Sequence, residues 1–89
     1  MTYTVRFTEK AKKIFEKLDK YTQLMLITWI EKNLEGTSDP RLHGKALTGT
    51  RKGQWRYRVG DYRIIAIIED GKLVITVITV GHRRNVYVL

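Results

Sequence analysis

Two short turns that contain glycine constrain the fold of this chain more than any other feature of its sequence. Gly60-Asp61 and Asp70-Gly71 separate runs of alternating or continuous apolar residues, and both dipeptides favour tight β-hairpins. The runs predict three consecutive strands, at Trp55–Val59, Tyr62–Glu69 and Leu73–Val80. The second and third strands are apolar on both faces over most of their length, which is typical of central strands. The sequence therefore predicts an antiparallel β-meander in its second half.

The first part of the chain has a helical periodicity instead. Alternation from Thr2 to Phe7 predicts a strand, and Thr8 is a suitable N-cap for a helix that follows it. After a short break at Asp19-Lys20, the apolar stripe of a second helix extends from about Tyr21 to Glu35. Gly36 is a natural end for this helix.

Together these elements predict an α+β fold. The expected order is an N-terminal strand, an antiparallel helix hairpin and an antiparallel β-meander, with the helices packed on one face of the sheet. Residues 1–89 have room for a single domain. Residues 36–54 form a long connection, and a connection of that length in a small domain is usually functional or disordered.

Basic residues are concentrated in and after this connection. The chain has 17 Lys and Arg against nine Asp and Glu, a net charge of +8, which points to a polyanionic partner such as nucleic acid or an acidic protein. Between residues 41 and 63 the only acid is Asp61. The basic residues of this stretch are Arg41, Lys45, Arg51, Lys52, Arg56, Arg58 and Arg63. A soluble basic domain without such a partner is the alternative.

The chain contains no cysteine, which excludes disulfides, thiolate metal sites and cysteine nucleophiles. Small secreted domains usually need such cross-links, so their absence favours a reducing cytoplasm. Residues 1–6 lack the long apolar stretch of a signal peptide. No segment has the roughly 18 apolar residues of a membrane-spanning helix. We therefore expect a cytoplasmic location and no contact with a membrane.

Three arginines of the predicted hairpin are expected on one face of the sheet. Strand alternation places Arg56 and Arg58 together, with aromatic and apolar residues on the other face. If Gly60-Asp61 is a two-residue turn, Arg58 pairs with Arg63. Like charges so close repel each other, and a bound phosphate would relieve that repulsion, because guanidinium forks match phosphate oxygens. Separate acidic neighbours or solvent are the alternative.

The segment Gly81-His82-Arg83-Arg84-Asn85-Val86-Tyr87 follows the last long strand and can turn back beside this hairpin. It adds two guanidiniums, an imidazole and a phenol. Arginine can neutralise a phosphoryl transition state, and Tyr or His can stack on a base or move a proton. Each residue also has an ordinary interpretation: Tyr87 as a packing residue and His82 as a surface hydrogen-bonding group. Trp29, in turn, is expected to pack between the two helices.

The helix pair and three segments resemble the RelE branch of the RelE/ParE toxins. The segments are Leu42-His43-Gly44-Lys45-Ala46-Leu47, the run from Trp55 to Arg63, and the close from Gly81 to Tyr87. The resemblance implies the toxin of a type II toxin–antitoxin system, an endoribonuclease (mRNA interferase) that enters the ribosomal A site and cleaves messenger RNA there. It implies attack by the ribose 2′-hydroxyl, with no metal or other cofactor. It also implies an acidic, RelB-like antitoxin that binds the toxin in a hetero-oligomer.

The resemblance also implies roles for individual residues. Arg56 and Arg58 occupy the two basic strand positions of the family, and Arg63 its phosphate-stabilising arginine. Arg83 and Tyr87 match its C-terminal arginine and tyrosine. The best-studied members have lysines at the two strand positions, one of them a proposed general base. Arginine does not readily fill that role, because its unperturbed pKa is above ~12.

We therefore predict that the three hairpin arginines orient and stabilise the phosphate. His82 is the candidate acid or base, because an unperturbed imidazole titrates near pH ~6.5. Further contacts to RNA are expected from exposed cationic or aromatic side chains, which solvation alone would also explain. These residues are His43, Lys45, Arg51, Lys52 and Arg84.

Two other functions remain open from the sequence. A ParE-like toxin of the same fold would inhibit DNA gyrase, and it would not need the phosphate-facing arginines. A non-catalytic basic module would bind nucleic acid through phosphates alone. The usual motifs of such modules, zinc-ligand spacing, paired strand aromatics and a recognition helix, are missing from the sequence.

Overall fold

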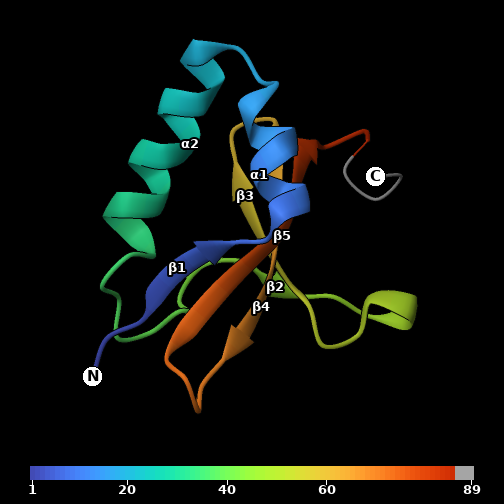
Figure 1. The fold of residues 1–89 in the computed structure, drawn as a ribbon. Coiled ribbons are helices and arrows are strands. Elements are labelled where there is room, and N and C mark those ends of the chain that lie inside the picture. Colours follow the sequence, from blue (N-terminus) through green and yellow to red (C-terminus); the bar gives the residue numbers. More distant parts are fainter. Residues whose placement is uncertain (86–89) are drawn as a thin grey trace.

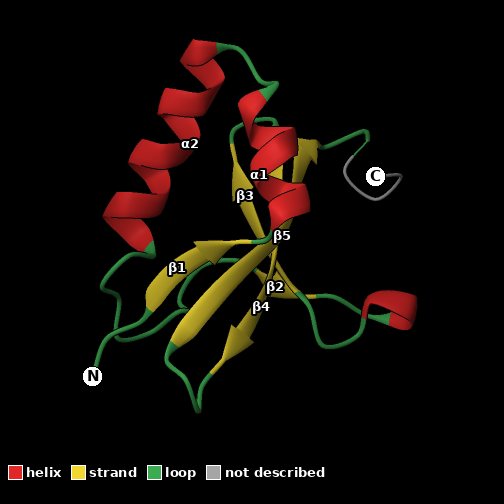
Figure 2. Ribbon diagram, in the orientation of Figure 1, coloured by secondary structure: helices red, strands yellow, loops and turns green. Residues whose placement is uncertain are grey.

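The computed structural model describes residues 1–85, which form two helices and a mixed five-stranded sheet (Figures 1 and 2). In chain order the elements are β1 (Thr4–Phe7), α1 (Glu9–Glu16), α2 (Lys20–Asn33), β2 (Lys45–Ala46), the short 3₁₀ helix η1 (Gly49–Arg51), β3 (Trp55–Val59), β4 (Tyr62–Glu69) and β5 (Val74–His82). The strand order in the sheet is β1-β5-β4-β3-β2. The predicted α+β architecture is confirmed.

Side chains that cap the backbone determine where both helices begin. The hydroxyl of Thr8 accepts a hydrogen bond from the backbone N–H of Ala11 at 3.1 Å, as the sequence predicts. Asp19 caps α2 by accepting bonds from the backbone N–H and the hydroxyl of Thr22, at 3.2 and 2.6 Å. These bonds hold the pKa of Asp19 below its usual value. The predicted break between the helices is therefore the start of α2.

The β3–β4 hairpin has the predicted register. Val59 pairs with Tyr62 and Arg58 with Arg63, and Gly60 adopts a positive φ of 60° in the two-residue turn. The β4–β5 turn differs from the prediction. It spans residues 70–73, because Glu69 pairs with Val74 and Leu73 takes the left-handed conformation, with φ 56°. Leu73 was predicted to begin the strand.

The sequence predicted an antiparallel sheet, but the sheet in the structure is mixed. β1 lies parallel to β5, with Thr4 opposite Val74 and Phe7 opposite Val77. The chain can return in parallel because the two helices form the connection between β1 and the meander. At the other edge of the sheet, β2 pairs with β3 over two residues only.

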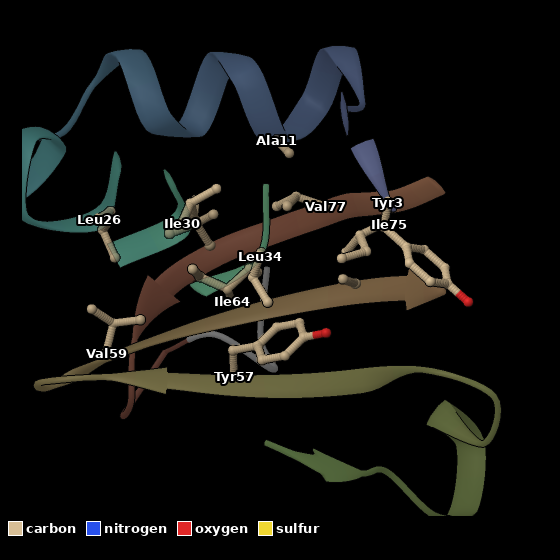
Figure 3. Packing of buried hydrophobic residues seen from close by; sticks show 12 residues of the cluster. Tyr3, Ala11, Leu26, Ile30, Leu34, Tyr57, Val59, Ile64, Ile75 and Val77 are labelled. Carbon is tan, nitrogen blue, oxygen red and sulfur yellow. The ribbon is translucent and has the colours of Figure 1, made fainter. Parts of the chain in front are cut away.

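The hydrophobic core lies between the helices and one face of the sheet (Figure 3). Leu26 and Ile30 of α2, and Leu34 at its C-cap, point toward Tyr57 and Ile64, and all five are buried. α1 packs on β1 and β5. No helix within residues 1–85 is long and apolar enough to cross a membrane.

Trp29 was predicted to pack between the two helices, but its ring packs elsewhere. Its ring contacts the rings of Tyr57 and His43, each with a centroid separation of 5.7 Å. Trp29 therefore joins α2 to β3 and to the connection before it. The helical period of the sequence places Trp29 on an apolar side of α2, but it does not say which element covers that side.

Candidate functional site

Arg56, Arg58 and Arg63 share the sheet face that points away from the helices, which we call the arginine face. On β3, Arg56 and Arg58 alternate with Tyr57 and Val59, which are buried beneath the helices. Arg58 lies directly opposite Arg63 in the β3–β4 register. The structure therefore brings together the three arginines that the sequence predicts to share a face.

Two of the three arginines on this face have no acidic partner within residues 1–85. Arg58 is exposed, and neither it nor Arg56 forms an ion pair with a carboxylate of residues 1–85. Lys45 of β2 lies directly opposite Arg56, so a second pair of like charges adjoins the first. Such cross-strand pairs are destabilising, and a bound anion would relieve both of them.

Two unsatisfied polar atoms lie in the same row of this face. Within the described part of the chain, the buried side-chain polar atoms that lack a hydrogen-bond partner are Nε of Arg56 and Oγ1 of Thr79. Arg56 pairs with Ile65, which in turn pairs with Thr79. Burying a polar group without a partner costs about 1–3 kcal/mol. Unsatisfied groups of this kind need an explanation, and both lie in the row of the sheet that carries Arg56.

Sequence reasoning missed Thr79, and an irregularity in the sheet explains why. Strict alternation along β5 would place Thr79 on the same face as Val77, which is buried beneath the helices. A register shift between Ile65 and Ala66 makes Ile65 pair with Thr79 and Ala66 with Val77. The extra residue moves Thr79 to the arginine face, as β-bulges do.

The C-terminal turn comes back beside the β3–β4 hairpin, as predicted. The backbone N–H of Arg83 donates to the carbonyl oxygen of Asp61 at 2.8 Å. Arg83 and Arg84 are exposed. Tyr87, the predicted C-terminal tyrosine, lies outside the described residues.

His82 is not placed among the arginines. It pairs with Tyr62, and the two rings meet edge to face with their centroids 5.7 Å apart. Tyr62 packs against the core beneath the helices, so the His82 ring lies on that side of the sheet. Its neighbour Gly81 pairs with Arg63.

Residues from the long connection border the arginine face at its β3 edge. A cleft of about 300 Å³ opens there. It is lined by Trp29, His43, Gly44, Lys45, Arg56 and Arg58. The predicted RNA-binding residues His43 and Lys45 therefore adjoin the arginines. Arg51 and Lys52 lie in and after η1, before β3 begins, and thus at the other end of β3 from Arg58.

A contrasting group of polar residues, which we call the Asp70 cluster, joins the same connection to the β4–β5 turn. Arg41 donates to both carboxylate oxygens of Asp70 at 3.0 Å, and the Tyr3 hydroxyl donates to Oδ1 at 2.6 Å. These bonds lower the pKa of Asp70 and raise that of Tyr3. Nearby, the buried hydroxyl of Tyr57 donates to the carbonyl oxygen of Pro40, and burial raises the pKa of Tyr57.

No group of three or more His, Cys, Asp or Glu that could hold a metal ion occurs within residues 1–85. The charged groups that the site offers are cationic, and they suit an anionic ligand.

Comparison with known proteins gives matches over almost the whole chain. The family model described as the ParE toxin of the type II toxin–antitoxin system, parDE, matches residues 5–87. Toxin RelG of Mycobacterium tuberculosis is 30% identical over 87 residues, which cover 98% of each chain.

Solved structures agree with this match. The toxin–antitoxin complex RelBE2 of M. tuberculosis contains a chain with a TM-score of 0.84 and 29% identity, covering 93% of this chain and 100% of that one. The intact E. coli RelBE complex contains a chain with a TM-score of 0.73 and 26% identity, covering 91% and 96%.

Proposed function

Since the chain belongs to the ParE toxin family of type II toxin–antitoxin systems, within the RelE/ParE superfamily, we propose that it is an endoribonuclease that cleaves messenger RNA in the ribosomal A site. The similarity to Toxin RelG and to the toxin chains of the RelBE complexes favours the RelE branch. By analogy with the RelE branch, we propose that the cleavage needs no metal.

The arginine face is the observation on which this proposal mainly rests. In the proposed step the 2′-oxygen attacks the adjacent phosphorus, the bond to the 5′-oxygen breaks, and a 2′,3′-cyclic phosphate forms. Negative charge grows on the phosphoryl oxygens as this happens. Arg56, Arg58 and Arg63 orient the phosphate and neutralise that charge, because guanidinium groups held in place stabilise such a transition state without further reorganisation.

The cleavage also needs a base for the 2′-hydroxyl proton and an acid for the leaving 5′-oxygen. His82 is the proposed candidate in the described chain, next to the residue that pairs with Arg63. Its ring contacts Tyr62 in this structure, so the role requires the C-terminal end of β5 to rearrange. Undiminished single-turnover cleavage by His82→Ala would remove His82 from the mechanism. Arg83 and Tyr87 are proposed to contact the scissile nucleotide.

Further contacts with RNA are proposed for residues outside the three arginines. His43 and Lys45 adjoin the arginine face, and Arg84 follows Arg83 in the C-terminal turn. Arg51 and Lys52 are more distant and would contact a longer stretch of the messenger or of ribosomal RNA.

The proposed protein partner is an acidic antitoxin. The similar chains of M. tuberculosis and E. coli were solved as toxin–antitoxin complexes. A net charge of +8 is suited to an acidic partner. We therefore propose a RelB-like antitoxin that forms a hetero-oligomer with the toxin in the cytoplasm.

Primer extension on a defined messenger tests the proposed activity. The protein is incubated with the messenger in the presence and absence of translating ribosomes. We expect cuts at A-site codons only with ribosomes, and their loss in Arg63→Ala. Arg41→Ala removes the same charge at the Asp70 cluster and should cut normally. The absence of cuts by folded protein would refute the nuclease, whereas cuts in naked RNA would refute the requirement for the ribosome.

The family model named for ParE supports a second candidate, inhibition of DNA gyrase. Loss of gyrase supercoiling at equimolar purified protein, without RNA cleavage, would favour it. Strongly salt-dependent RNA binding without any cleavage product would instead indicate a non-catalytic basic module.

A further inference from the structure

We propose that the cleft at the β3 edge binds one unpaired nucleobase of the RNA strand whose phosphate lies on the arginine face. This inference rests on the proposed function, and it adds a base-binding site to the phosphate site. The cleft and the face are continuous, because Arg56 and Arg58 line both. Its volume of about 300 Å³ is at the lower end of the range for small-ligand pockets.

Two of the six residues that line the cleft, Trp29 and His43, are aromatic. The rings of Trp29 and His43 meet edge to face, with centroids 5.7 Å apart and planes inclined by 67°. His43 is exposed and Trp29 is half-buried, so both rings border the open space. Proteins that bind single-stranded RNA stack bases on rings of this kind. A phosphate alone would need the arginines but not the two rings.

Both walls are held in place without a ligand. Trp55 donates its Nε1–H to the carbonyl oxygen of His43 at 2.7 Å. Gly44, at φ +86°, brings the backbone so close to β3 that a Cβ atom would collide with the carbonyl oxygen of Arg56. The ring of Tyr57 in turn supports Trp29, with their centroids 5.7 Å apart. A site that needs no ordering on binding loses less affinity to conformational entropy.

The positive charges that line the cleft suit a nucleotide better than a neutral aromatic ligand. Lys45 and Arg56 lie opposite each other across β2 and β3, and Arg58 continues the cationic line toward Arg63. A base in the cleft therefore places its attached phosphate beside these side chains. Stacking of the base and pairing of the phosphate would act together on one nucleotide.

Fluorescence anisotropy with uncleavable strands tests this inference. The probe is a labelled single-stranded RNA hexamer with a 2′-O-methyl group on every ribose, which blocks the proposed nucleophile at every linkage. A matched series lacks the base at one position at a time and keeps the phosphates. We expect one position at which loss of the base weakens binding by about tenfold, since base–aromatic stacking has effects of this size.

His43→Ala should abolish this preference and leave binding to the strand without that base unchanged. Because His43 is exposed, this variant should fold. Lys45→Ala should weaken binding to every strand alike, because it removes only a charge. Lys72→Ala is the control of equal charge change: it lies in the β4–β5 turn, paired with Glu69, and should bind as the unaltered protein does.

The proposal is wrong if no position in the series depends on its base, or if His43→Ala keeps the full preference. It is also wrong if His43→Ala weakens binding of the antitoxin but not the preference, because the cleft would then belong to the protein interface. These measurements use no ribosome and no cleavage. A base preference in a protein without nuclease activity would refute the proposed function and retain the base site. Nuclease activity without a base preference would refute the base site and retain the proposed function.

Discussion

The arginine face and the Asp70 cluster treat the same kind of side chain in opposite ways. In the Asp70 cluster, both terminal nitrogens of Arg41 bind one carboxylate, which also accepts a bond from Tyr3. On the arginine face, Arg56 and Arg58 have no carboxylate partner within residues 1–85. The first group ties a loop to a turn. On the arginine face, the guanidinium groups of Arg56 and Arg58 remain available to an anionic ligand.

This difference has an energetic meaning. Each cross-strand pair of like charges costs on the order of 0.2–1 kcal/mol, and each unsatisfied buried group about 1–3 kcal/mol. Small proteins have only about 5–15 kcal/mol of stability in total. The arginine face therefore lowers stability by a share that the core beneath the other face of the sheet has to offset.

The largest expected effect separates the two groups by activity. Arg58→Ala should slow single-turnover cleavage on ribosomes by about 100-fold, because loss of one donor to a developing oxyanion has effects of this size. Its melting temperature should stay the same or rise, since a repulsive neighbour of Arg63 is removed. Equal activity of Arg58→Ala and Arg41→Ala in the same assay would remove the functional difference between the two groups.

Thr79→Val should stabilise the protein by about 1 kcal/mol, which raises the melting temperature by about 4–8 °C. Valine has nearly the same shape and removes a buried hydroxyl that has no partner. Thermal unfolding followed by circular dichroism measures the change, with Thr79→Ser as the variant that keeps the hydroxyl. A lower melting temperature for Thr79→Val would mean that the hydroxyl is satisfied in solution.

Arg41→Ala should change the melting temperature by less than Thr79→Val does, and in the opposite direction. It should lower the melting temperature by a few degrees and leave cleavage unchanged, because Arg41 holds Asp70 and does not lie on the arginine face. Exposed ion pairs contribute little unless their geometry is bidentate, as it is here. Thermal unfolding measures the change in stability, and primer extension on the same preparation measures cleavage. Loss of cleavage without a change in melting temperature would contradict the prediction.

The smallest expected effect is a dependence on pH. Hydrogen bonds from Arg41 and Tyr3 lower the pKa of Asp70 in the folded protein below its ordinary value. The contribution of Asp70 to stability is therefore present above the unfolded pKa, near pH 4, and is lost as the pH falls through the lower folded value. Melting temperatures of the unaltered protein and of Asp70→Asn, measured from pH 7 to pH 2, should converge toward the acid end. A constant difference over this range would contradict the assignment.

The parts of the site that could be predicted from sequence are those set by local geometry. A two-residue turn and strand alternation place Arg58 opposite Arg63, and both depend on residues 55–63 alone. Thr8 was likewise identifiable as a cap, because a cap depends on the next three residues. Local pattern therefore accounts for most of the arginine face.

The remaining parts depend on contacts between distant segments. Thr79 reaches the arginine face only through the bulge opposite Ile65. Trp29 lines the cleft because His43 of the connection lies beside it. The parallel pairing of β1 depends on how two helices cross the sheet. None of these has a signal in a single stretch of sequence, since each depends on the path of the whole chain.

The neighbouring positions of β1 and β5 have a consequence for biosynthesis. The first strand of the chain has its only described strand partner at residues 74–77, and α1 packs on the same strand. Both elements must therefore wait, during translation, for a segment made about seventy residues later. A nascent chain that lacks β5 also lacks the strand that carries Thr79. We expect the complete fold, and with it any harm to the cell that makes it, to appear only late in synthesis.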